Sequence, residues 1–297
     1  MNQTGISNFK ALTDGELIEL LFISGDSLSH DAVDEFLERG QRMIPLLNHI
    51  AADKNSWTRP MPEWWAVVHA TYILGSFEST DTLPGLLGAL RWADAFDNEW
   101  VTEDLPSIFG KVGRPAYGHL LAVAQDFSAG WGARSIALSG LAAIGIRDKL
   151  LLPGVLDFAA KIVENETEPL PFRQTAANVL LDFRSKRHSR ILKKFGREEA
   201  LRRDEIASYE GSFYDWEVDE FLSSDNNDLE FYERDWLSFY DPEERQRRQE
   251  YWEEERETRD REDKDNGRAL FPSQREQSNC LCGSGLPYED CCMRKVH

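Results

Sequence analysis

Apolar side chains recur at spacings of three and four residues through the first two hundred positions of this 297-residue chain. That period places them on one face of a helix, and short runs of Gly, Pro, Asp and Ser separate the successive segments. The first helix has a recognisable start, because Thr13 and Glu16 have the spacing of a capping box and stand before Leu17. This part of the sequence lacks the alternation typical of strands, so we expect an all-α fold.

The positions and spacing of three prolines indicate a repeat of helix pairs. Pro45, Pro84 and Pro153 each stand next to aliphatic residues near an expected helix start. The first two are 39 residues apart and the next interval is 69, which leaves room for one unit between them. Residues 117–121 supply that unit without a proline. Helix pairs with a period in the thirties to forties are typical of an α-solenoid, in which each pair buries its apolar face on its neighbours.

The second helix of each pair is expected to end at a glycine. An aliphatic residue precedes Gly75, Gly113 and Gly145, which follow one another at intervals of 38 and 32 residues. A glycine suits the left-handed conformation that closes many helices. We therefore predict stacked helix pairs over residues 1–203.

Three segments of this region, residues 31–50, 100–106 and 134–138, resemble HEAT-like bacterial proteins of a family without an assigned function. The resemblance covers roughly residues 13–200. It implies a HEAT-like α-solenoid and no particular reaction, since fold alone does not give function.

The acidity of the chain is regional. Of the net charge of −19, residues 1–203 carry −4, residues 204–265 carry −16 and residues 266–297 carry +1. Residues 204–240 contain ten aromatic side chains among the carboxylates, and we expect them to pack as a cap on the solenoid, because disordered segments are poor in aromatics. Residues 241–278 are predicted to form a charged, solvent-exposed helix followed by a linker.

All four cysteines of the chain lie within thirteen residues near its end, at positions 280, 282, 291 and 292. Their spacing is C-x-C-x8-C-C, and four thiolates can complete the tetrahedral shell of one structural zinc ion without leaving a position for substrate. Two disulfides or four unused thiols are the alternatives. The clustering and the Gly-Ser-Gly turn after Cys282 favour zinc, with Cys280, Cys282, Cys291 and Cys292 as its ligands in a knuckle over residues 279–297.

This segment closely resembles the SEC-C motif, the zinc knuckle at the C-terminus of the SecA translocation ATPase and of many unrelated bacterial proteins. The four cysteines, Gly283-Ser284-Gly285 and Tyr288 carry the resemblance. In SecA the knuckle binds the SecB chaperone and ribosomes and is rich in lysine, whereas Glu289 and Asp290 stand here among positions that are often basic. The resemblance implies a binding module, without the motor, because the chain has no G-x-x-x-x-G-K-[ST] sequence.

Residues 184–203 contain nine Lys or Arg side chains and offer a phosphate-binding ridge for RNA or a ribosome. The alternative, which we favour, is the solvated face of the last helix, because aromatics for base stacking are nearly absent there. Other residues that could line a ligand or catalytic site also have structural interpretations. We expect Trp64, Trp65 and Trp131 to fill space between helices, His69 and His119 to be packed in the core, and Thr102 with Glu103 and Asp104 to begin a helix.

Together these features predict a zinc-binding adaptor that recognises a protein partner through the helical platform and the knuckle. A ribosome- or RNA-associated factor using residues 184–203 is the alternative, and an unrecognised enzyme is the second alternative. We expect no catalytic residues, no small-molecule substrate and no membrane insertion. The sequence has neither a signal-peptide pattern at its start nor an apolar run of the ~20 residues that a membrane helix needs, so we expect a cytoplasmic protein.

Overall fold

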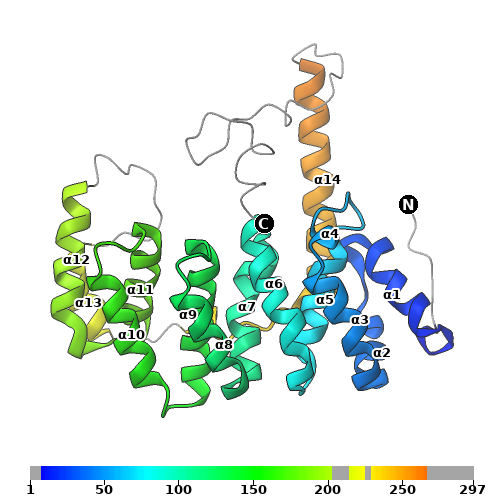
Figure 1. The fold of residues 1–297 in the computed structure, drawn as a ribbon. Helices are drawn as coiled ribbons and strands as arrows, with labels where there is room; N and C mark the ends of the chain where they lie inside the picture. Colours follow the sequence, from blue (N-terminus) through cyan, green and yellow to red (C-terminus); the bar gives the residue numbers. More distant parts are fainter. Residues whose placement is uncertain (1–7, 203–213, 225–228, 266–297) are drawn as a thin grey trace. The chain divides into compact units, whose positions relative to one another are not determined.

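The computed structural model describes residues 8–202, 214–224 and 229–265. Every secondary-structure element in these ranges is an α-helix or a short 3-10 helix, which confirms the all-α class for the described residues (Figure 1). The chain divides into two compact units, one ending at Asp241 and the other beginning at Pro242, and each is described separately below. No helix in the described ranges is long and apolar enough to span a membrane.

The α-helices of the first unit follow one another with short connections. They are α1 (Asp14–Ile23), α2 (His30–Arg39), α3 (Ile44–Ala52), α4 (Lys54–Trp57), α5 (Trp65–Ser76), α6 (Leu83–Ala95), α7 (Glu99–Val112), α8 (Arg114–Gln125), α9 (Trp131–Arg147), α10 (Leu152–Glu164), α11 (Leu170–Asp182), α12 (Ser189–Arg202) and α13 (Glu217–Ser223). The 3-10 helices are η1 (Phe9–Ala11), η2 (Gly25–Ser27), η3 (Gly40–Met43), η4 (Thr80–Thr82), η5 (Lys186–His188), η6 (Glu230–Tyr232) and η7 (Trp236–Tyr240).

The helix starts predicted at Thr13 and at the three prolines are confirmed. Thr13 forms a capping box with Glu16 at the start of α1. Pro45, Pro84 and Pro153 lie in the first turns of α3, α6 and α10, where the missing N–H of proline costs no intrahelical bond. The intermediate unit also has its proline, because α8 begins at Arg114 and carries Pro115 in its first turn, just before the segment that the sequence pattern had identified.

The expectation for the glycines is right at one position and wrong at two. Gly113 ends α7 with a φ of 74°, a positive value that favours glycine. Gly75 and Gly145 instead lie inside α5 and α9. Their role is close packing, since an added Cβ would lie 2.8 Å from Ile108 Cγ2 at the first and 2.9 Å from Leu152 Cδ1 at the second.

The helices of the first unit form two connected rows. In one row α5, α7, α9 and α11 pack each against the next. In the other, α3, α6, α8 and α10 each pack against one or more members of the first row, in chain order (Figure 1). Helix α5 is buried at almost every position and α9 at most positions, which explains why their apolar residues surround the helix instead of forming one stripe.

A carboxylate from one helix pair fixes the start of the next. Asp94 near the end of α6 accepts a hydrogen bond from the backbone N–H of Ala133 in the first turn of α9. The absence of a side chain at Gly132 makes this approach possible, because a Cβ there would lie 1.7 Å from Asp94 Oδ1. Burial raises the pKa of Asp94, although the hydrogen bond from Ala133 acts in the opposite direction.

The chain after α12 returns along the first row of helices. Helix α13 contacts α11 and α12, η6 contacts α7 and α9, and η7 contacts α7. At η7, Trp236 Nε1 donates to the backbone oxygen of Tyr72 at 3.1 Å, so the segment reaches α5. The described part of the acidic aromatic segment therefore extends well beyond the last helix pair, where we expected it to form a cap.

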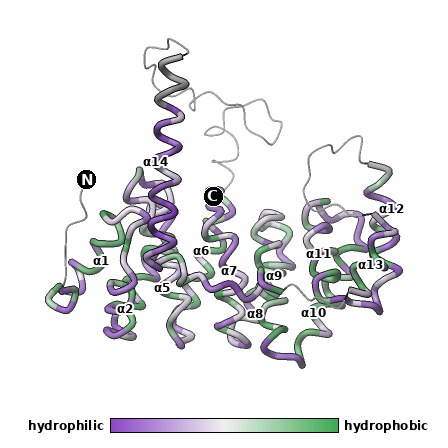
Figure 2. Tube along the Cα trace, turned by 180° about the vertical axis from the view of Figure 1, so that it is seen from behind, coloured by the Kyte–Doolittle hydropathy of each residue, from purple (hydrophilic) through white to green (hydrophobic). Residues whose placement is uncertain are grey.

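The second unit contains one described element, α14 (Pro242–Asp265), which confirms the charged helix predicted after residue 240. Figure 2 shows it as hydrophilic along the part that is coloured. Its side chains are exposed over residues 250–259, including Tyr251 and Trp252. Ion pairs join Arg247 to Glu244 at 2.8 Å and Arg256 to Glu253 at 4.0 Å, each across three residues of the helix.

Candidate functional site

The predicted zinc ligands Cys280, Cys282, Cys291 and Cys292 lie outside the described residues. Their identification depends on the chemistry of the donor set, four thiols at the C-x-C-x8-C-C spacing of a closed zinc shell. Within the described ranges, no group of three or more His, Cys, Asp or Glu side chains is arranged to hold a metal ion.

His69 lies in an aromatic cluster between α5 and η7. Its Nε2 is 2.8 Å from the backbone oxygen of Gly25 and its Nδ1 is 3.1 Å from the hydroxyl of Tyr240. The Phe239 ring packs against Trp65 and Trp100, with centroid distances of 5.9 and 5.6 Å. His69 is thus a packed core histidine, as predicted, and η7 supplies much of its surroundings.

Two other core assignments from the sequence were wrong. His119 is exposed on α8. Trp131 is 48% exposed at the start of α9, whereas Trp65 is buried as expected and Trp64 is half-buried. Neither the apolar run around His119 nor the large ring of Trp131 identifies which helix face the neighbouring helices cover.

Glu103 and Asp104 lie inside a helix and not at its start. Helix α7 begins at Glu99 with the side chain of Asn98 as its cap, so the predicted start at Thr102 is wrong. Asp104 accepts a hydrogen bond from the Tyr72 hydroxyl, and Glu103 pairs with Arg234 of the returning segment at 2.6 Å. Burial raises the pKa of Asp104, with the Tyr72 and Arg234 contacts opposing the rise. Both carboxylates therefore serve to attach that segment to α7.

The basic stretch 184–203 is partly neutralised by carboxylates. Lys193 pairs with Asp219 at 2.7 Å and Arg197 with Asp215 at 3.3 Å, which joins α12 to the acidic segment. Two further pairs in the stretch join Arg187 to Asp157 at 2.7 Å and Lys194 to Glu166 at 3.4 Å. These contacts reduce the positive charge that the stretch presents to a phosphate backbone.

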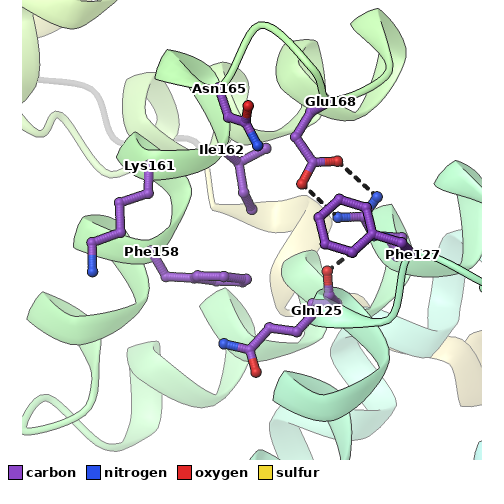
Figure 3. A pocket seen from close by; sticks show the side chains of 9 residues that line it. Gln125, Phe127, Phe158, Lys161, Ile162, Asn165 and Glu168 are labelled. Atoms are coloured by element: carbon purple, nitrogen blue, oxygen red, sulfur yellow. Dashed lines mark hydrogen bonds and ion pairs between the residues drawn. The ribbon is translucent and has the colours of Figure 1, made fainter.

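A pocket of about 290 Å³ opens between the C-terminal ends of α8 and α10 and the loops that follow them. Phe127 and Phe158 face it from opposite sides, as Figure 3 shows. Its lining residues are Ala124, Gln125, Phe127, Arg134, Phe158, Lys161, Ile162, Asn165 and Glu168. No sequence pattern indicated this site, because its lining comes from several segments that only the fold brings together.

The floor of the pocket is a buried ion pair. Arg134 Nη1 and Nη2 donate to the two carboxylate oxygens of Glu168 at 2.7 and 2.8 Å, and Arg134 Nε donates to the backbone oxygen of Ala124 at 3.0 Å. The side chains of the pair are 3% and 5% exposed. The guanidinium is also sandwiched between Phe127 and Phe172, at 4.8 and 4.2 Å from the ring centroids.

The comparisons with known proteins support one part of the chain. The SEC-C motif matches residues 278–294, a segment that includes all four cysteines. Neither the curated proteins nor the solved structures contain a significant match to this chain. The SEC-C resemblance is thereby confirmed, while the HEAT-like resemblance stays a prediction.

Proposed function

We propose that this protein is a zinc-binding adaptor that joins a helical-repeat platform to a SEC-C knuckle and recognises a protein partner. The observation that carries the proposal is the SEC-C match over residues 278–294, in a chain whose described remainder is helical. Two binding modules on one chain raise the affinity for a partner that engages both, because the second contact is made at a high local concentration.

In this proposal Cys280, Cys282, Cys291 and Cys292 hold one structural zinc ion. The donor set fits the metal, because four thiolates satisfy zinc completely and leave no open position for a water molecule or a substrate. When bound, the metal would supply folding free energy to a segment too short to form its own core. Thiolate ligands also need a reducing environment, which supports a cytoplasmic location.

A HEAT-like α-solenoid is the architecture we propose for the platform. Two rows of helices packed in chain order are what stacked helix pairs produce. A repeated contact supports the same interpretation: Arg134 and Arg173 are 39 residues apart, and each donates from Nε to the backbone oxygen of the residue ten positions earlier. That interval equals the one between Pro45 and Pro84.

The alternatives receive less support. An RNA- or ribosome-binding factor needs free cations to contact phosphates. Two cations of the basic stretch are instead paired with carboxylates, Lys193 with Asp219 and Arg197 with Asp215. For an enzyme, the side chains of Asp104 and His69, two titratable groups in the core, already hydrogen-bond with Tyr72 and Tyr240. We therefore propose a binding role without catalysis.

Metal analysis of the full chain, purified under reducing conditions without chelator, tests the zinc site. We expect about one zinc per chain. Replacing Cys291 and Cys292 with Ser should abolish binding, whereas Ser284→Ala, which leaves all four thiols in place, should retain it. Wild-type protein with much less than one zinc per chain would contradict the metal site.

Co-purification tests the adaptor. Tagged wild-type chain and the Cys291→Ser/Cys292→Ser variant should be compared at low and high salt. A protein partner retained at high salt by the wild type and lost from the variant is the expected result. Recovery of ribosomes or RNA only at low salt would favour the alternative, because phosphate contacts weaken steeply with salt.

A further inference from the structure

The aromatic wall of the pocket between α8 and α10 is held in place before any ligand arrives. Phe127 is 72% exposed, an unusual position for a phenylalanine. The loop that carries it is closed by Asp126, whose carboxylate accepts from the backbone N–H and the hydroxyl of Ser128 at 2.8 and 2.7 Å. The Phe127 ring lies against Arg134, which Glu168 fixes. A rigid exposed ring binds apolar groups at a small entropic cost.

The polar groups at the rim of the pocket include three side chains that can donate hydrogen bonds. Lys161 is exposed, and among the described residues no carboxylate lies within ion-pair distance of it. Asp157, one turn earlier on α10, pairs with Arg187 instead. The amides of Gln125 and Asn165 also line the pocket. Because Arg134 and Glu168 neutralise each other, the ammonium of Lys161 gives the site a net positive charge.

These features specify a ligand with an apolar body and a carboxylate. A volume of about 290 Å³ lies at the lower end of the ~300–1,000 Å³ range for ligand pockets, so the site accommodates one side chain and not a large cofactor. Phe127, Phe158 and Ile162 offer the apolar contacts, and Lys161 with the two amides offers donors to the carboxylate. A C-terminal residue with a large apolar side chain carries both groups on its Cα atom.

We propose that this pocket binds the C-terminal residue of a partner polypeptide, with its apolar side chain between Phe127 and Phe158 and its terminal carboxylate at Lys161. The inference rests on the proposed adaptor function and names the chemistry that the platform recognises. The pocket lies on the platform itself, so it is a contact additional to that of the knuckle.

Methyl NMR of the full chain, observed at Ile162 in the pocket wall, tests the proposal. The probes are the pentapeptide Gly-Ser-Gly-Ser-Phe with a free C-terminus, the same peptide with a C-terminal amide, and phenylacetate. We expect the Ile162 signal to shift with the free peptide, and the amide to bind about fivefold or more weakly, since it lacks the charge that Lys161 attracts. Phenylacetate should bind more weakly than the free peptide, because it makes no backbone contacts.

Variants of the full chain test the two proposed contacts, Lys161 with the carboxylate and Phe127 with the apolar side chain. Lys161→Gln should reduce the affinity for the free peptide to that for the amide, and Phe127→Ala should weaken both peptides. Lys149→Gln, at an exposed lysine that does not line the pocket, should change neither. Unperturbed methyl signals elsewhere would show that each variant is folded.

Three outcomes would overturn the inference: no shift at Ile162, equal binding of acid and amide, or binding of phenylacetate as strong as that of the free peptide. The last would identify a free acid as the ligand. Zinc content, and the dependence of co-purification on Cys291 and Cys292, report on the knuckle and not on this pocket. Their success alongside a failed titration would therefore reject the pocket alone.

Discussion

Two arginines 39 residues apart make the same backbone contact in different surroundings. Arg134 at the start of α9 donates to the backbone oxygen of Ala124 at 3.0 Å, and Arg173 at the start of α11 donates to that of Val163 at 2.9 Å. Each thereby ties the end of the preceding helix to its own. Each guanidinium also lies against a phenylalanine ring, Phe172 in the first case and Phe195 in the second.

The carboxylate partners of the two arginines differ. Glu168 is nearly inaccessible and binds Arg134 with both oxygens. Glu198 is 27% exposed, and it divides its bonds between Arg173 at 3.0 Å and Lys194 at 3.3 Å. Removal of one member of a buried ion pair leaves the other charge without a partner. A partly exposed carboxylate such as Glu198 still contacts water and a second cation when its arginine is removed. The two arginines should therefore contribute differently to the free energy of unfolding.

The largest effect is expected from Arg134→Met. Removal of the guanidinium leaves the Glu168 carboxylate buried without its partner, which should lower the free energy of unfolding by about 3–5 kcal/mol. Urea unfolding of the full chain measures the loss. The double variant Arg134→Met/Glu168→Leu is the control, because an apolar pair of similar volume should recover most of it. A double variant as unstable as the single one would show that the backbone contact to Ala124 dominates.

Arg173→Met should cost less. Glu198 retains Lys194 and water, so the main loss is the set of hydrogen bonds made by the guanidinium, about 1–3 kcal/mol. The same urea unfolding experiment gives the comparison. An equal or larger loss than for Arg134→Met would contradict the argument that burial of the carboxylate decides the difference.

The sequence predicted local features of this fold well. Helix positions, the capping box at Thr13 and the prolines at helix starts depend on neighbouring residues, which a sequence pattern contains. The roles of Arg134 and Arg173 depend on carboxylates 34 and 25 residues away, and hydropathy places an arginine on the surface. Their spacing of 39 residues, equal to that of Pro45 and Pro84, was the signal available.

Positions set by tertiary contacts were harder to predict. Gly75 and Gly145 looked like helix ends because close packing and capping both select glycine. The ten aromatics of residues 204–240 correctly indicated an ordered segment in its described part, but its path along α7 to α5 depends on which helix face is left uncovered. The pocket at Phe127 likewise depends on separate segments meeting. The cysteines were recognised because their spacing is local.

The starts of α9 and α11 also differ in capping, which Gly132→Ala tests. Asp94 of α6 accepts a hydrogen bond from the first turn of α9, whereas the residue before α11, Pro169, makes no side-chain cap. A Cβ at position 132 would displace the Asp94 carboxylate, and we expect a loss of about 1–3 kcal/mol in urea unfolding. Gly118→Ala in α8, where an added Cβ meets nothing within 4 Å, is the control and should stabilise by about 0.5–1 kcal/mol. If Gly132→Ala and Gly118→Ala changed the free energy of unfolding equally, the proposed capping of α9 by Asp94 would be wrong.

The smallest effects concern pH, and they have opposite signs at the two helix starts. Burial raises the pKa of Asp94 above its ordinary value of 3.8. The folded state therefore holds that proton more tightly than the unfolded state, so this contribution to stability is lost as pH rises from about 3.8 through the raised pKa. For Glu198, burial acts to raise the pKa, but the bonds from Arg173 and Lys194 outweigh it and lower the pKa below 4.5.

The contribution of Glu198 is therefore present above pH 4.5 and is lost as pH falls through its lowered pKa. Thermal unfolding of Asp94→Asn and Glu198→Gln between about pH 3 and 6 measures both. Relative to the wild type, Asp94→Asn should become more stable as pH rises, and Glu198→Gln should become less stable. If both variants had pH profiles parallel to that of the wild type, neither carboxylate would titrate differently in the folded and unfolded states. Each variant removes one titrating group and leaves the other in place. If the stability differences of the two variants from the wild type change with pH in opposite directions, Asp94 and Glu198 both contribute to the pH dependence of stability in this acidic range.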